Sequence, residues 1–111
     1  MPTLRKLDRA ALEKVARVFS IFSDATRLSI LMELREGPRT VGELVEAVSV
    51  SQGNVSRQLQ LLHDHGLLHR EKKGTQVIYS IKDKFIFPLC RQVCEKLNRD
   101  AQESSGHIYQ I

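Results

Sequence analysis

The sequence predicts a mostly helical fold with one small β-hairpin, in the order of four helices, two strands and a final helix. Apolar residues recur every three or four positions over most of the chain, which is the spacing of a buried helix face. One stretch, residues 77–82, alternates apolar and polar side chains instead, as a strand does. Glycine and proline fall between these segments and mark their ends.

The first two predicted helices lie on either side of Asp24. Apolar residues from Leu4 to Phe22 keep the helical spacing and predict an amphipathic helix. Asp24 is the type of residue that caps a helix start, and the helix after it, through Leu34, is apolar on nearly every side. We therefore expect this second helix at the centre of the fold, ended by Gly37–Pro38.

The next segment predicts two short helices joined by a tight turn. Thr40 and Glu43 have the spacing of a capping box, in which each side chain bonds the backbone amide of the other residue. Ser51 is expected to cap a second helix that reaches about His65, and Gly66 suits the left-handed residue that ends a helix. The outer face of this second helix carries no large apolar side chain.

Beyond Gly66 the period changes from helical to alternating. Residues 67–71 and 77–82 predict two antiparallel strands, with residues 72–76 as the tip of the hairpin. A last helix is expected to begin close to Pro88. This order is that of a winged helix-turn-helix. The last helix carries a single apolar stripe, formed by Ile86, Leu89, Cys90, Val93, Cys94 and Leu97.

A chain of 111 residues has room for one domain, which we place at residues 1–101, with residues 102–111 as a flexible tail. So short a chain buries a modest fraction of its surface, and a second subunit would add stability. No apolar run approaches the roughly 20 residues that span a bilayer, and the first residues lack the apolar core of a signal peptide. We expect a cytoplasmic protein without a membrane partner, in which both cysteines are free thiols.

The second helix of the helix–turn–helix carries side chains of the kind that recognise DNA. Gln and Asn can form paired hydrogen bonds with adenine, and Arg reads guanine or holds phosphate. Small residues at the helix start allow close entry into a major groove, and a basic hairpin can lie on the DNA backbone as a wing. The net charge of +4 fits a polyanionic partner. We predict that double-stranded DNA is contacted by Thr40, Ser51, Gln52, Asn54, Ser56, Arg57, Gln60, Lys72, Lys73 and Gln76.

Several stretches resemble the ArsR/SmtB family of bacterial repressors. They are FSDATRLSIL at 22–31, SQGNVSRQLQLL at 51–62, and the wing segments 66–68 and 74–81. The resemblance covers about residues 12–97 and implies a homodimer built on the first and last helices, bound to an imperfect palindrome at a promoter. It also implies repression that is relieved by a ligand, commonly a soft metal or metalloid. Gln58 stands where the family usually has His.

The resemblance does not extend to the metal-sensing patterns of the family. The helix before the recognition helix has no cysteine, and the last helix has no histidine to join Asp83. Cys90 and Cys94 remain, four residues apart on one helix face and about 6 Å apart at the backbone. Such a pair suits a soft metal ion, arsenite or an oxidant, but it also lies in the apolar stripe, where cysteine packs as a small hydrophobe. The sequence leaves both interpretations open.

We predict a transcriptional repressor that binds a palindromic operator as a homodimer. The sequence establishes no cofactor, and a soft metal ion or arsenite at Cys90 and Cys94 is the candidate ligand. The alternatives are a winged-helix dimer that binds protein through its last helix, and a repressor without a thiol ligand. DNA affinity that falls steeply with salt would favour a repressor, because counterion release requires it. The sequence has no glycine-rich phosphate loop, GxSxG turn or Cys–His pairing that would indicate an enzyme.

Overall fold

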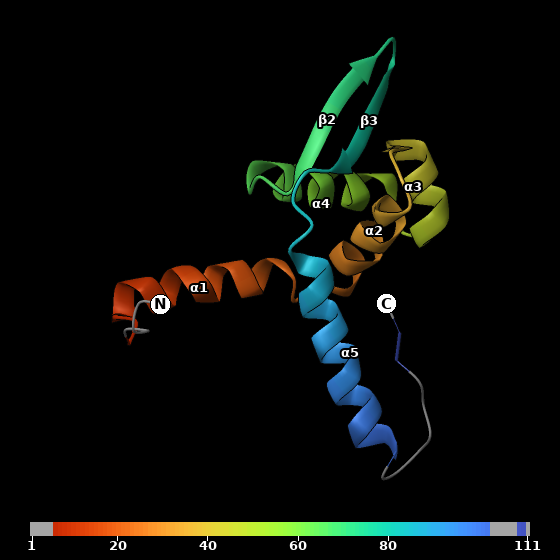
Figure 1. Cartoon of the computed structure of the whole chain (residues 1–111). Coiled ribbons are helices and arrows are strands. Elements are labelled where there is room, and N and C mark those ends of the chain that lie inside the picture. The colour runs from red at the N-terminus through yellow and green to blue at the C-terminus, as the bar shows by residue number, and fades with distance from the viewer. Residues whose placement is uncertain (1–5, 103–108, 111) are drawn as a thin grey trace.

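A computed structural model of the chain describes residues 6–102 and 109–110. It confirms the predicted order of elements and adds one short strand. The elements are α1 (Arg9–Ile21), α2 (Ala25–Arg35), β1 (Arg39–Thr40), α3 (Val41–Val48), α4 (Gln52–Asp64), β2 (Leu68–Lys73), β3 (Gln76–Ile81) and α5 (Ile86–Gln102) (Figure 1).

The core lies where α2, α3, α4 and the sheet meet, and α2 is central to it as predicted. Asp24 caps α2 by accepting a 2.9 Å hydrogen bond from the Arg27 amide. After α4, Gly66 adopts the left-handed conformation, with φ +77°, that the sequence predicts for this position. The side chains that are buried almost completely are Ile30, Leu31, Leu34, Leu44, Val55, Leu59 and Leu62.

The sheet has three antiparallel strands in the order β1-β3-β2. The sequence analysis missed β1, which pairs Arg39 with Tyr79 and Thr40 with Ile78. A strand of two residues is too short to show any alternation of apolar and polar side chains, so the sequence pattern does not reveal it.

The hairpin is longer than predicted, and its tip is shorter. Lys72 pairs with Val77 and Lys73 with Gln76, so residues 72, 73 and 76 belong to the strands and not to the tip. Only Gly74 and Thr75 form the turn, and Gly74 has a φ of +62°. Glycine at the first position of a two-residue turn is typical of a type II′ hairpin, whose twist matches that of the strands. The hairpin extends beyond the helices (Figure 1).

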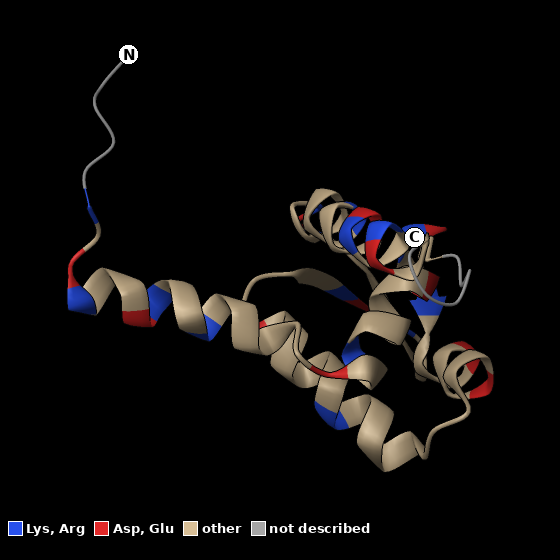
Figure 2. Cartoon of the chain, turned by 90° about the horizontal axis from the view of Figure 1, so that it is seen from below, with Lys and Arg blue, Asp and Glu red and all other residues tan. Residues whose placement is uncertain are grey.

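Helices α1 and α5 project from this core in different directions (Figure 1). Helix α1 starts later than predicted, because Asp8 caps it by accepting a 2.8 Å hydrogen bond from the Ala11 amide. Leu7 therefore precedes the helix, and Leu4 lies outside the described residues. Basic and acidic residues are mixed along α1 (Figure 2), so the helix does not carry charge of a single sign.

The projecting helices expose apolar side chains that the core does not cover. Phe19 is 60% exposed and Val93 is 57% exposed, although both belong to apolar stripes at helical spacing. No helix in the described part of the chain is long and apolar enough to cross a membrane. The exposed apolar face, as we call this set, consists of Leu12, Val15, Val18 and Phe19 of α1 with Leu89, Val93 and Leu97 of α5.

Most of the predicted tail, 103–108 and 111, lies outside the described residues. Two of its residues return to α5. The side-chain amide of Asn98 donates to the Tyr109 carbonyl at 2.6 Å and accepts from the Tyr109 amide. Gln110 then lies against the apolar side of the helix, among the residues around Cys90 and Cys94.

Candidate nucleic-acid interface

The helix–turn–helix is held by caps at the start of each of its helices. The Thr40 hydroxyl accepts from the Glu43 amide at 3.1 Å, and the Thr40 amide donates to the Glu43 carboxylate at 2.8 Å, which confirms the predicted capping box. The Ser51 hydroxyl accepts from the Asn54 amide at 3.3 Å. Between the helices, Ser49 takes a left-handed conformation with φ 54° and turns the chain.

The buried side of α4 fixes which of its residues face outward. Val55, Leu59 and Leu62 are wholly buried, as the sequence predicts. The opposite side is polar and turned to solvent, so α4 can approach another molecule without exposing apolar surface. The exposed residues are Gln52, Gly53, Ser56, Arg57 and Gln60, while Asn54 and Gln58 are half-buried.

A groove of about 320 Å³ separates this helix from the wing. It brings together four of the residues that we expect to contact DNA, and these come from β1, α4 and β3. Its walls combine the starts of two helices with the end of the hairpin, all of which offer polar groups. The lining residues are Thr40, Val41, Gly42, Gln52, Ser56, Thr75, Gln76 and Val77.

The remaining predicted contacts lie outside the groove lining. Gln60 bridges α4 and the wing, since it donates to Asp64 at 2.7 Å and accepts from Arg70 at 3.1 Å. Successive residues of a strand point to opposite faces, so Lys72 and Lys73 lie on opposite sides of the hairpin. Lys72 shares its face with Arg70 and hence with α4, whereas Lys73 is on the other face. The sequence analysis had treated the two lysines alike.

Sequence reasoning missed a chain of hydrogen bonds behind the recognition helix. Arg27 of α2 donates to Gln58 at 2.8 Å, and Gln58 donates to Asn54 at 2.9 Å. Arg27 also donates to the carbonyls of Ser20 and Ile21 at the end of α1. The only sequence signals were one arginine after a helix cap and a glutamine four residues from an asparagine. Neither signal indicates that the two groups meet.

Cys90 and Cys94 are half-exposed and line an apolar pocket of about 440 Å³. Met32 lines the same pocket from α2, so three residues with sulfur-bearing side chains line one space. Burial raises the pKa of the Cys90 thiol, and the charge of the neighbouring Cys94 raises this pKa further. Among residues 6–102 and 109–110, no three or more His, Cys, Asp or Glu side chains cluster as ligands of one metal ion.

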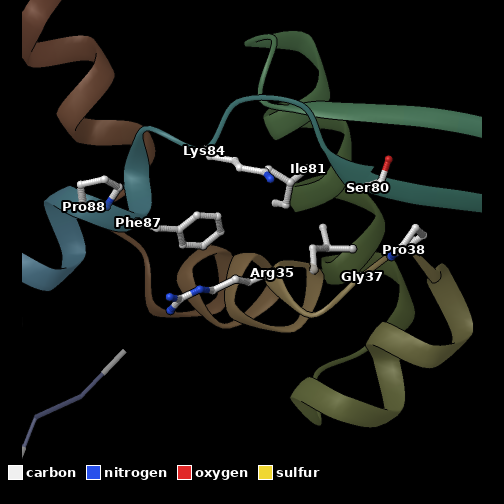
Figure 3. Close-up of a pocket in the computed structure, with 9 residues that line it drawn as sticks. Arg35, Gly37, Pro38, Ser80, Ile81, Lys84, Phe87 and Pro88 are labelled. Carbon is white, nitrogen blue, oxygen red and sulfur yellow. The ribbon is translucent and has the colours of Figure 1, made fainter.

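A second pocket, of about 530 Å³, lies at the junction of α2, β3 and α5. Figure 3 shows Ile81 of β3 and Phe87 of α5 pointing into it above α2. The Arg35 guanidinium lies 5.3 Å from the centre of the Phe87 ring, at the distance of a cation–π contact. This contact joins the start of α5 to α2.

A polar recognition helix beside a three-stranded wing defines the class of winged helix-turn-helix transcription regulators. Comparison with known proteins agrees: a family model described as "Bacterial regulatory protein, arsR family" matches residues 24–70. The chain is 36% identical over 83 residues to the HTH-type transcriptional regulator NmtR of Mycobacterium tuberculosis, a match that covers 75% of this chain and 69% of that relative. The chain belongs to the arsR family, whose members are DNA-binding transcription regulators and not enzymes.

Two solved structures resemble the whole fold. The antimony-specific transcriptional repressor AntR aligns with a TM-score of 0.71 at 29% identity, over 94% of this chain and 96% of that one. The homodimeric winged helix-turn-helix DNA-binding domain Mb0332 of Mycobacterium bovis aligns with a TM-score of 0.67 at 28% identity, over 97% of this chain and 100% of that one. The predicted fold class is thereby confirmed.

Proposed function

We propose that this chain is a repressor that binds a palindromic operator as a homodimer, with α4 in the major groove and the hairpin along the DNA backbone. The observation that carries the proposal is the polar outer face of α4 beside the groove to the wing. Gln52 and Ser56 of that groove, with exposed Arg57, offer donors and acceptors to base edges. Lys72, on the α4 side of the hairpin, is placed for a phosphate.

The exposed apolar face supports a second copy as the partner of α1 and α5. Its seven large apolar residues form stripes on two helices, and four of them, Phe19, Leu89, Val93 and Leu97, line one apolar pocket. Exposed apolar surface of this kind marks an interaction site. The related Mb0332 domain is homodimeric, and its fold matches this chain throughout. A two-fold dimer presents its two recognition helices to successive major grooves, about 34 Å apart, which requires a palindromic operator.

The recognition face is tested by Gln52→Ala and Arg57→Ala, each compared with the parent on a duplex selected from a random library. Each lost base contact should weaken binding by about 1–3 kcal/mol. Arg91→Ala is the matched control, because Arg91 is an exposed arginine on α5, remote from α4. The recognition face is misplaced if both variants bind like the parent, or if Arg91→Ala weakens binding equally.

We further propose that Cys90 and Cys94 form the effector site, at which a thiophilic ligand favours a dimer that fits DNA less well. A ligand shifts such an equilibrium only by binding one state more tightly than the other. Two observations support this role: both thiols are half-exposed, and both line the pocket with Met32. Sulfur ligands in apolar surroundings suit soft metals and trivalent arsenic.

The test measures operator affinity with and without arsenite, cadmium or persulfide, in the parent and in the Cys90→Ser/Cys94→Ser double variant. We expect release of DNA by at least one probe in the parent and by none in the double variant, which should still bind the operator. If the parent ignores all three probes and the double variant only loses stability, the cysteines are packing residues.

A further inference from the structure

Arg27 lies at the centre of a hydrogen-bond chain that joins three helices. Its Nε donates to the Ile21 carbonyl at 2.6 Å, and its Nη2 to the Ser20 carbonyl at 3.3 Å. The carbonyls in the last turn of a helix have no partner within that helix, and a cation is favourable there. The remaining nitrogen, Nη1, donates to Oε1 of Gln58 on α4 at 2.8 Å. Arg27 thus ties the end of α1 to the recognition helix.

The chemistry of arginine sets the direction of every bond that follows. A guanidinium has donors and no acceptor, so Gln58 must turn its oxygen toward Arg27. Its nitrogen Nε2 is then left to face Asn54, and it donates to Oδ1 of Asn54 at 2.9 Å. Because Oδ1 receives this bond, the amide nitrogen Nδ2 of Asn54 is the end that is left to other partners.

We propose that Arg27 and Gln58 are positioning residues that fix the Asn54 amide so that α4 presents a hydrogen-bond donor to the DNA groove. The proposal rests on the proposed function, in which α4 enters the major groove. A fixed donor selects a base edge that offers an acceptor, such as N7 or O6 of guanine or O4 of thymine. It disfavours the amino group of cytosine, which is a donor. It also disfavours the paired contact to adenine, in which Oδ1 of Asn54 would have to accept from the adenine amino group.

The variant Gln58→Glu reverses the direction of the hydrogen bond between residues 58 and 54. A carboxylate still accepts from Arg27, but it has no proton to donate, so Asn54 must turn Nδ2 toward it and Oδ1 toward the groove. Gln58→Met is the uncharged companion, which keeps the length of the side chain and removes both hydrogen bonds. Asn54→Ala, alone and combined with each Gln58 variant, completes a double-mutant cycle.

The measurement is the base preference of each variant, obtained by selection from a randomised duplex library, with thermal unfolding to verify the fold. We expect Gln58→Glu to shift one position of each half-site from guanine or thymine toward adenine or cytosine. Gln58→Met should lose the preference there and bind the parent's selected site about tenfold more weakly. In the Asn54→Ala background, neither Gln58 variant should change the preference at that position.

An unchanged base preference in Gln58→Glu and Gln58→Met would overturn the proposal, and so would a Gln58 effect that persists in the Asn54→Ala background. The added charge of Gln58→Glu cannot imitate the expected result, because phosphate repulsion weakens all sequences alike. If Gln58→Glu does not fold, the double-mutant cycle of Gln58→Met with Asn54→Ala still tests the proposal. Should the parent select no sequence at all, the proposed function fails first and this proposal fails with it.

Discussion

The centre of the molecule and its two projecting helices differ in how far their apolar side chains are exposed. In the centre, Leu31, Leu44 and Leu59 are at most 1% exposed. On the projecting helices, Leu12 is 50% exposed and Val93 is 57% exposed. Similar side chains at similar helical spacing are thus covered in one region and left open in the other.

The difference indicates that the two regions obtain their stability from different sources. The central region has its own core, three capped helices and a sheet, and these are complete within one chain. The exposed apolar face gains stability only when something covers it, which in our proposal is a second copy. Stability of the centre should therefore be independent of protein concentration, while that of the projecting helices should depend on it.

The largest expected effect is that of Leu59→Ala, which removes a wholly buried side chain from the centre. We expect a loss of about 2–5 kcal/mol, from lost burial and from the cavity left behind. Leu12→Ala makes the same chemical change on α1 and should cost less than about 0.5 kcal/mol in dilute protein. Urea unfolding at low and high protein concentration measures both variants. Equal losses in the two variants would contradict the comparison.

A charge placed on the exposed apolar face should separate the subunits without unfolding the centre. Val93→Asp buries a carboxylate in the proposed dimer contact, where an unpaired charge is strongly unfavourable. Gln92→Asp adds the same charge to the same helix beside the apolar stripe and serves as the control. Sedimentation should find Val93→Asp monomeric and folded, with Gln92→Asp dimeric. A dimeric Val93→Asp would mean that α5 is not the interface.

The sequence predicted the central region well because its signals are local. A helix cap needs only an oxygen-bearing side chain three residues before an amide, so Asp24, Thr40 and Ser51 could be identified directly. The hairpin tip was misjudged, since basic and polar residues at 72–76 suit a loop and a paired strand end equally. Strand pairing decides between them, and it depends on residues across the sheet.

The sequence analysis predicted which residues form the candidate site but not how their side chains contact one another. The outer face of α4 followed from its buried face, because a helix has a fixed period. The hydrogen bond from Arg27 to Gln58 joins residues 31 positions apart, and no periodic pattern spans that separation. For the same reason, no sequence pattern indicates that Met32 of α2 shares a pocket with the thiols of α5.

A smaller effect is expected from Gly53→Ala, which should change stability and DNA affinity in opposite directions. Gly53 lies in the first turn of α4, and a Cβ there would come no closer than 3.8 Å to its nearest neighbour, Arg57. Gly53→Ala should therefore fold without strain and gain up to about 1 kcal/mol in stability, because glycine is a poor helix former. Operator affinity should fall nonetheless, since the added methyl group blocks close approach of DNA. Unfolding and DNA titrations on one preparation test both effects, and unchanged affinity would place the helix start away from the groove.

The smallest expected effect concerns the pH dependence of the cap on α3. The Thr40 amide, and secondly its hydroxyl, hold the pKa of Glu43 below its ordinary value of 4.5. A carboxyl whose pKa is lowered by folding stabilises the fold above its unfolded pKa, and this contribution is lost as pH falls through the folded pKa. Glu43→Gln keeps an oxygen that can accept from the Thr40 amide but has no charge to titrate.

We expect the parent to be slightly more stable than Glu43→Gln at pH 7, and the difference to shrink as the pH falls below about 4.5. The measurement is the difference in Tm between the two proteins at a series of pH values and constant ionic strength. Glu46→Gln is the control, because Glu46 is an exposed glutamate on the same helix that makes no cap. Since the cap lies wholly within one chain, this difference should not change with protein concentration, in contrast to every effect of the exposed apolar face. A difference that stays constant from pH 7 to pH 3, or that appears equally in Glu46→Gln, would show that the charge of Glu43 does not stabilise the start of α3.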